Sequence, residues 1–333
     1  MLLRSRGGQP PRLPSTLSKM LLILTNSIDG TSDEIVRRVG AARAFRFNVD
    51  LWQDYQIEVT GEGFALSDPS GRHVHSHQIE ACYVRKPTFD DPLSIPEGGC
   101  LEAWQRSQIS YLCQELYNIC KRSGKIRLVE KGAQQRFGKF SQMQVAANYF
   151  SVPSWRFTKG SVSPHFDRPT IAKTLVADFV ENYRVFFTTR VESGTLDPQY
   201  PWFLQDEVDA DFDLTVVYVA GRSFAFTLDR NSFDGVDWRK QINKTDLPWI
   251  RYKISQDFDE RIRRFMTEAQ LEFGRLDFLL ADGIEYFLEV NPNGQWAWLD
   301  MEGKEGVFDA VIAELTKNWT EQHCESIHRS SCV

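Results

Sequence analysis

The sequence has 333 residues, of which 42% are hydrophobic, 25% charged and 13% aromatic. This length predicts two or three domains, and the composition excludes a disordered, collagen-like or fibrous chain. The net charge of −6 gives no reason to expect a nucleic-acid partner. No run approaches the roughly 18 consecutive apolar residues that a membrane-spanning helix needs, so no membrane association is expected.

The N-terminus, the cysteines and the histidines carry only weak signals. Residues 1–19 are expected to be a disordered or wrongly assigned extension, because too few apolar residues follow their basic residues for a signal peptide. The six cysteines form no CxxC pair, which favours a reducing, cytoplasmic location. His73, His75 and His77 would share one face of a strand and could bind a transition metal, but a solvated strand or loop is the favoured interpretation.

Residues 20–126 alternate predicted strands and helices, which is typical of a small open α/β domain. Helices are predicted after Thr31 and from Leu101 to the stop at Ser123-Gly124, where apolar residues recur at intervals of three and four. This region contains neither GxxxxGK[ST] nor GxGxxG, so no phosphate-binding loop of those types is expected. Strands are predicted at 21–25, 44–49, 57–66 (with a bend at Gly61 and Gly63) and 81–84.

Residues 127–318 show an α+β pattern, and a flexible tail is expected at 319–333. Helices are predicted at 137–147, 257–273 and 307–318. Strands are predicted at 128–130, 170–175, 202–208, 214–219, 223–228, 275–281 and 285–290.

Asp277, Glu289 and Asn291 are the candidate metal ligands. Glu289 and Asn291 are two residues apart at the end of a strand, so their side chains share a face. A two-residue loop at Asp282-Gly283 would point Asp277 to the opposite face, whereas a three-residue loop would place it opposite Glu289. In the second case the three oxygen-bearing side chains converge and suit Mg²⁺, which is favoured over a merely solvated acidic rim.

Lys139 and Lys173 are candidate anion-binding residues. Most lysines lie at the surface, but the strand that carries Lys173 is apolar on both sides of it. A buried lysine requires an anion, and a phosphate bound near Mg²⁺ would supply one.

Together these residues resemble the ATP-grasp superfamily, and the segment Tyr286–Trp296, which ends in NPNGQW, resembles the microviridin or graspetide macrocyclases. Val84-Arg85-Lys86-Pro87 and Asp237-Trp238-Arg239 also resemble elements of that family. The resemblance covers about residues 20–318. It implies a pre-ATP-grasp domain at 20–126 and an ATP-grasp domain at 127–318, with a central subdomain at about 150–210 and a C-terminal one at about 211–318.

The resemblance also implies roles for individual residues. Asp277, Glu289 and Asn291 would hold Mg²⁺. Lys139 and Lys173 would contact the phosphates of ATP, and Asp213 the ribose. Asp206 and the backbone of Val208 would contact adenine, and Arg239 would be catalytic. The sequence departs from the family pattern at Thr215, where an arginine is usual. Either Arg239, Arg184 or Arg230 would then compensate, or turnover would be weakened.

The implied activity is that of an ADP-forming ligase acting on a ribosomal precursor peptide. Side chains of Asp or Glu would be activated as acyl phosphates and closed onto Ser, Thr or Lys as ester or amide rings. The leader of the precursor is expected to dock near 185–202, where Phe186, Phe187, Tyr200 and Trp202 lie, although these aromatics could equally be core. The alternatives are a ligase that adds free amino acids to a protein or small acid, and a catalytically weak peptide-binding homologue. A homodimer is suggested by the resemblance alone.

Overall fold

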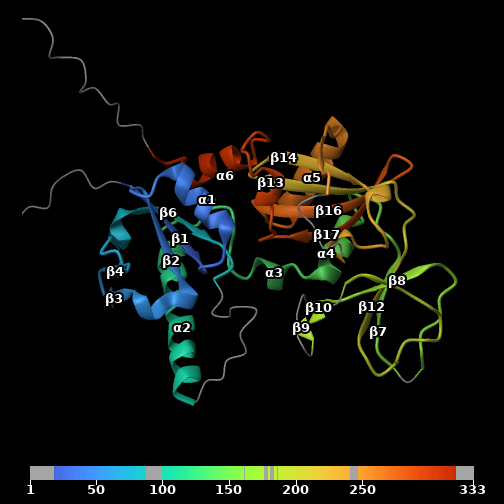
Figure 1. Cartoon of the computed structure of the whole chain (residues 1–333), viewed down its shortest axis with the longest axis horizontal. Coiled ribbons are helices and arrows are strands. Elements are labelled where there is room, and N and C mark those ends of the chain that lie inside the picture. Colours follow the sequence, from blue (N-terminus) through green and yellow to red (C-terminus); the bar gives the residue numbers. More distant parts are fainter. Residues whose placement is uncertain are drawn as a thin grey trace, which may run out of the picture.

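The computed structural model describes residues 19–87, 100–160, 162–175, 179–180, 184–185, 187–240 and 247–319 (Figure 1). Almost all of the expected extension at 1–19 and of the expected tail at 319–333 lies outside these residues. So do Phe186 and the side chain of Arg184. Within the described residues, no helix is both long enough and apolar enough to cross a membrane.

The N-terminal part is built on a parallel sheet in the order β2-β1-β6. These strands are Ala44–Asn48, Met20–Thr25 and Ile79–Val84, and every residue of β1 is buried. One face of β1 packs on helix α1 (Gly30–Val39) and on the C-terminal helix α6 (Val307–Thr316), and the other on α2 (Cys100–Arg122). Helices on both faces explain why β1 reads as a continuous apolar run.

A small antiparallel sheet lies beside it in the order β3-β4-β5 (Gln56–Thr60, Gly63–Ser67 and His73–His75). The single strand predicted at 57–66 is therefore wrong, because Gly61 and Glu62 form a hairpin loop between β3 and β4. His73 and His75 are exposed on β5, and the ring of His75 stacks on that of His77.

The central part contains an antiparallel sheet in the order β11-β8-β12-β7 and a two-stranded ladder of β9 and β10. Helices α3 (Ala133–Arg136) and α4 (Lys139–Ala146) precede it along the chain. Its strands are β7 (Trp155–Thr158), β8 (Thr170–Lys173), β9 (Phe179–Val180), β10 (Arg184–Val185), β11 (Thr189–Val191) and β12 (Trp202–Asp206).

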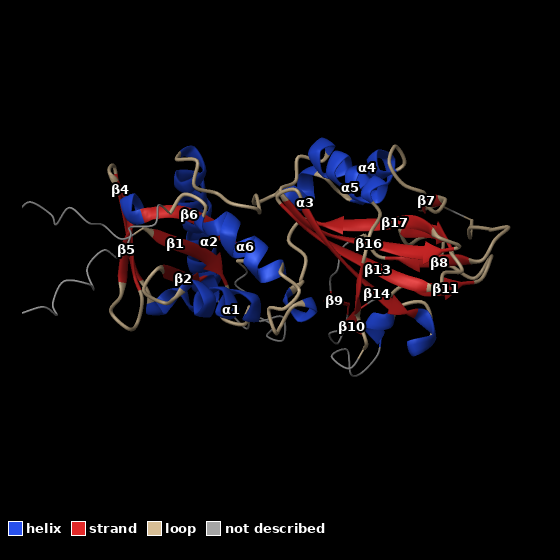
Figure 2. Ribbon diagram, turned by 90° about the horizontal axis from the view of Figure 1, so that it is seen from above, coloured by secondary structure: helices blue, strands red, loops and turns tan. Residues whose placement is uncertain are grey.

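The C-terminal part contains a five-stranded antiparallel sheet in the order β15-β14-β13-β16-β17, with α5 (Gln256–Glu268). The strands are β13 (Phe212–Val219), β14 (Arg222–Asp229), β15 (Ile250–Tyr252), β16 (Phe273–Ala281) and β17 (Ile284–Asn291). Figure 2 shows α4 and α5 on one face of this sheet. Even-numbered residues of β13 and β16 pack in one core cluster with these two helices.

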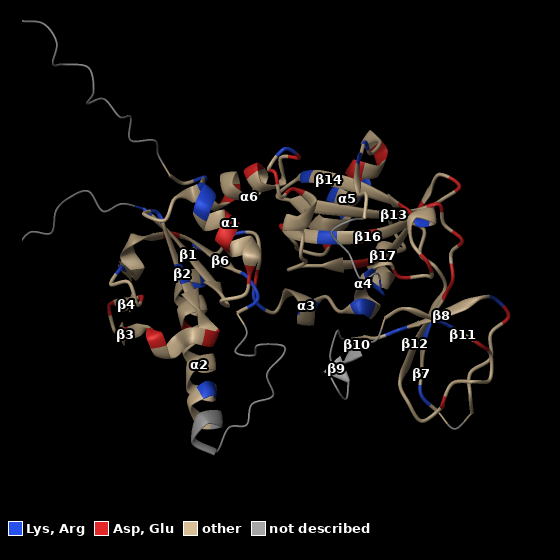
Figure 3. Cartoon of the chain, in the orientation of Figure 1, with Lys and Arg blue, Asp and Glu red and all other residues tan. Residues whose placement is uncertain are grey.

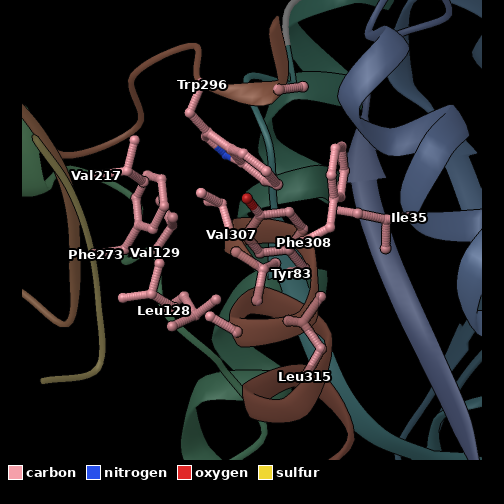
Figure 4. Packing of buried hydrophobic residues seen from close by; sticks show 14 of the residues in the cluster. Ile35, Tyr83, Leu128, Val129, Val217, Phe273, Trp296, Val307, Phe308 and Leu315 are labelled. Atoms are coloured by element: carbon pink, nitrogen blue, oxygen red, sulfur yellow. The ribbon is translucent and has the colours of Figure 1, made fainter. Parts of the chain in front are cut away.

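The opposite face of this sheet has two halves. Val217, Val219 and Phe273 pack against α6 and Trp296 in a core shared with the N-terminal sheet (Figure 4). Because side chains alternate along a strand, Asp213 and Thr215 on β13 and Asp277 on β16 continue the same face. The polar half of this face carries the candidate site.

Two further predicted elements differ from the structure. Residues 128–130 form no strand: only Ile126 makes a bridge, to Cys82, and Leu128 has φ 62°. The helix predicted at 257–273 ends at Glu268, because Gln270 takes φ 55° and the N–H of Leu271 donates to the carbonyl of Met266. This left-handed stop frees Phe273 to begin β16.

Candidate active site

The hairpin of β16 and β17 brings the predicted metal ligands together. Asp282 and Gly283 form a two-residue loop with φ 50° and 74°, and Ala281 pairs with Ile284. Phe278 pairs with Phe287, but Asp277 pairs with Glu289, so Leu288 is the extra residue of a β-bulge. The bulge places Asp277 opposite Glu289, as the prediction required, although the loop has two residues rather than three.

Glu289 is surrounded by cations. The Nζ of Lys139 lies 3.4 Å from its Oε2, and the Nδ2 of Asn291 donates to its Oε1 at 3.1 Å. Burial would raise the pKa of Glu289, but Lys139, Arg239 and the Asn291 hydrogen bond outweigh it and lower that pKa to about 2. Glu289 is therefore a carboxylate at neutral pH.

Asp277 is held by two arginines and a threonine. Its Oδ2 lies 3.1 Å from Nη2 of Arg239 and 2.8 Å from Nη2 of Arg275, and the hydroxyl of Thr215 donates to its Oδ1 at 2.8 Å. Arg239 is fixed in turn by Asp237, whose carboxylate accepts the backbone N–H of Arg239 at 3.0 Å. Thr215 therefore binds the carboxylate of Asp277, although it stands at the position where the family that the sequence resembles usually has an arginine.

The two predicted lysines lie on different elements at the same site. Lys139 begins α4 and donates to the carbonyl of Thr174 at 2.7 Å, while Lys173 ends β8 and donates to Oε1 of Gln205 at 2.7 Å. Figure 3 shows basic residues on α4 and on β16. Burial lowers the pKa of Lys173 to about 8, against the attraction of Glu289. A phosphate near Glu289 would restore the charge that burial disfavours.

Gln142 joins α4 to the strand that carries Glu289 and Asn291. Its Nε2 donates to the carbonyl of Val290 at 2.9 Å, and its Oε1 accepts the N–H of Val290 at 3.0 Å. The same Nε2 also reaches the carbonyl of Phe137 at 2.9 Å. The buried amide thus bonds the edge strand β17 as a neighbouring strand would, two residues from the bulge.

The residues expected to contact the nucleoside lie near the site with different surroundings. Asp213 is 2.8 Å from Nη1 of Arg230, and burial raises its pKa to about 6 despite this arginine. Asp206 ends β12 and lies 3.6 Å from Nη1 of Arg168. Val208 follows β12 and is half-buried.

The expected peptide-docking region is only partly visible. Tyr200 is 61% exposed and makes an edge contact with the half-buried Trp202. Neither ring is a fully buried core residue. Val185 lies on β10 and Phe187 is half-buried.

The oxygen donors fit Mg²⁺ that is shared with a phosphate ligand. The hairpin supplies two carboxylates and one amide, and the described residues contain no group of three or more His, Cys, Asp or Glu arranged for a metal. Mg²⁺ commonly takes one or two carboxylates and completes its shell with water and phosphate oxygens. The surrounding lysines and arginines suit those phosphates.

Comparisons with solved structures identify the fold. A Chryseobacterium gregarium RiPP-associated ATP-grasp ligase, solved with ADP and a leader and core peptide, is 21% identical with a TM-score of 0.77. The comparison covers 90% of this chain and 97% of that one. The macrocyclase MdnC of Microcystis aeruginosa, bound with its precursor peptide MdnA, is 19% identical with a TM-score of 0.74 over 90% and 99% of the two chains. This chain has the ATP-grasp fold.

The same fold extends to an enzyme with another kind of substrate. The D-alanine–D-alanine ligase of Bacillus anthracis, solved with ATP, is 11% identical with a TM-score of 0.53 over 91% of this chain and 98% of that one. No protein-family model matches the sequence. None of the curated proteins matches it either. The ATP-grasp likeness is thus carried by structure, at identities that establish fold and not substrate.

Three contributors to the site were not predicted from the sequence. Arg275 precedes Asp277 by two residues on a strand, so the alternation of side chains could have revealed it. Gln142 stood in a predicted helix without any signal of its contact with Val290. Arg85 belongs to a motif noted for its resemblance alone, yet its side chain reaches the loop after Asn291.

Proposed function

We propose that this protein is an ADP-forming ligase that uses Mg·ATP to activate a carboxylate. The observation that supports this most directly is the bulged hairpin, which sets Asp277 opposite Glu289 with Lys139 at 3.4 Å. On an ATP-grasp fold, this combination of oxygen ligands and cations suits the phosphates of ATP.

Each site residue has a role in this proposal. Asp277, Glu289 and Asn291 would hold Mg²⁺, which when bound neutralises phosphate charge. Lys139 and Lys173 bind phosphate oxygens where the central part (about 150–210) faces the C-terminal part (about 211–318). The remaining contacts are those of the nucleoside and of the reacting group: Asp213 with the ribose, Asp206 and the backbone of Val208 with adenine, and Arg239 with the transferred phosphate.

The reaction proceeds through an acyl phosphate. A carboxylate oxygen attacks the terminal phosphorus, and the bond to the ADP oxygen breaks. A hydroxyl or amine then attacks the acyl carbon, loses its proton and expels phosphate, which leaves an ester or an amide. Arg239 is held by Asp237 beside Asp277, where its charge would stabilise the oxyanion of this second step.

The substrate proposed is a ribosomal precursor peptide whose Asp or Glu side chains close onto Ser, Thr or Lys. Its support is that the two structures described with the highest TM-scores contain a leader and core peptide and a precursor peptide, respectively. The exposed Tyr200 beside Trp202 offers aromatic surface for a leader segment. The free thiols of Cys82, Cys113 and Cys120 support a cytoplasmic location.

Mass spectrometry coupled to ADP release tests the proposal. With Mg·ATP and the peptides encoded beside its gene, the protein should release ADP while a peptide loses one water per ring. ADP release with a gain of mass would indicate amino-acid ligation instead. Absence of nucleotide turnover with every acid tested would refute the ligase and favour a peptide-binding homologue.

A further inference from the structure

Arg85 has a fully buried charged side chain and lies far in the sequence from the residues of the proposed nucleotide site. It directly follows β6 in the N-terminal part, and its side chain is 0% exposed. Its Nε lies 3.7 Å from Oδ2 of Asp29, which also accepts the hydroxyl of Ser32 at 2.6 Å. A guanidinium removed from water is strongly destabilising unless its donors are satisfied, so its other partners matter.

Within the described part of the chain, those other partners all lie in the loop that follows the proposed metal ligands of β17. Nη1 donates to the carbonyl of Asn293 at 3.0 Å, to Oδ1 of Asn293 at 2.6 Å and to the carbonyl of Gly294 at 2.9 Å. Nη2 donates to Oε1 of Gln295. In the opposite direction, the Nδ2 of Asn293 donates to the carbonyl of Val84 at 3.4 Å.

The same loop, residues 293–295, also contacts Arg275 and Asn291 of the candidate site. Nη1 of Arg275 donates to the carbonyl of Gln295 at 3.0 Å, while its Nη2 binds Asp277. Gly294 donates to the carbonyl of Asn291 at 3.0 Å. A Cβ on Gly294 would lie 2.8 Å from Cβ of Arg275 and 3.1 Å from Cβ of Asn291. Gly294 therefore packs closely against Arg275 and Asn291, with no room for a side chain between them.

We propose that Arg85 is a positioning residue for magnesium binding: by fixing residues 293–295 it holds Asn291 directly, and Asp277 through Arg275, in place. The proposal rests on the proposed function, because it requires those two side chains to be metal ligands. It makes nucleotide binding depend on the packing of the N-terminal part against β17. Residues behind metal ligands typically change metal affinity 10- to 100-fold when they are mutated.

The test is calorimetric titration of Mg·ADP at several Mg²⁺ concentrations, which needs no peptide and no turnover. Arg85→Met should weaken Mg·ADP binding by about tenfold and raise the Mg²⁺ concentration needed for it. Arg85→Lys should restore part of the loss, because a lysine retains the charge and some of the donors. Asn293→Ala should act in the same direction without altering Arg85, so it replaces Arg85→Met if that variant fails to fold.

Arg222→Met is the matched control. Nη2 of Arg222 donates to the carbonyl of Ala310 at 2.8 Å and so joins β14 to α6, but no contact of Arg222 with residues 293–295 is among those described. It should lower the thermal midpoint and leave the Mg²⁺ dependence unchanged. If the Arg85 and Asn293 variants also lower only the thermal midpoint, Arg85 is merely structural and the proposal is wrong. If the wild-type protein binds no Mg·ADP, the proposed function itself is refuted.

Discussion

Replacing Gln142 with methionine should destabilise the protein and disturb its proposed metal ligands. The change keeps the volume of the side chain but removes its hydrogen bonds to the N–H and carbonyl of Val290, a residue that is 1% exposed. A buried backbone group without a partner costs about 1–3 kcal/mol. With these two groups, the carbonyl of Phe137 that Gln142 also bonds, and some apolar gain from methionine, we expect a loss of about 3 kcal/mol in the free energy of unfolding.

Denaturant titration of the ligand-free protein measures this loss. Gln142→Glu should retain the acceptor for the Val290 N–H but place a carboxylate against the carbonyls of Val290 and Phe137, so it should also be strongly destabilised. Gln114→Met is the control, because the one hydrogen bond that the described residues give the Gln114 side chain is to the side chain of Asn118 on α2. A loss below about 0.5 kcal/mol for Gln142→Met, no larger than in the control, would refute the reasoning.

Three further predictions concern the site itself. Glu289→Gln should weaken Mg·ADP binding at least about tenfold by calorimetry with unchanged circular dichroism. The Glu289 pKa is lowered from 4.5 to about 2, so the stability that this carboxylate contributes should be lost as the pH falls from 4.5 to about 2. The same loss of stability with acid in Glu289→Gln as in the wild type would contradict this. Burial lowers the pKa of Lys173 from 10.5 to about 8, so the unfolded chain binds this proton more tightly than the folded one. The free energy of unfolding should therefore rise as the pH increases from about 8 to 10.5 in the wild type, but not in Lys173→Met. Thr215→Val removes the donor to Asp277 and should slow ADP release by about tenfold, whereas Thr195→Val, at an exposed hydroxyl, should not.

The hairpin shows how far sequence reasoning reached and where it stopped. The strands, the Asp282-Gly283 turn and the shared face of Glu289 and Asn291 follow from local patterns. The bulge at Leu288 does not, because it forms where the edge strand meets Gln142 and where Ser151 accepts the N–H of Phe287. Those partners lie more than a hundred residues away in the sequence, so no local pattern could choose between the two registers.

The loop after Asn291 illustrates the same limit. The segment NPNGQW and the Val84–Pro87 motif were each noted from the sequence, but only the folded chain shows that Arg85 binds the carbonyls of Asn293 and Gly294. Conversely, the position of Arg275 could have been predicted from the sequence, because it lies two residues before Asp277 on an evident strand. Two predictions failed because a residue other than glycine takes the left-handed conformation. Gln270 ends the helix predicted at 257–273 early, and Leu128 interrupts the strand predicted at 128–130. Glycine is the residue that usually marks such a position in a sequence.

The transfer of oxygen from substrate to phosphate tests the central claim most directly. A peptide substrate whose Asp and Glu carboxylates carry heavy oxygen would be incubated with Mg·ATP and the protein, and the released phosphate analysed by mass spectrometry. Activation through an acyl phosphate predicts one heavy oxygen in each phosphate released with the product. Product formed with unlabelled phosphate would contradict carboxylate activation at the site of Asp277, Glu289 and Arg239.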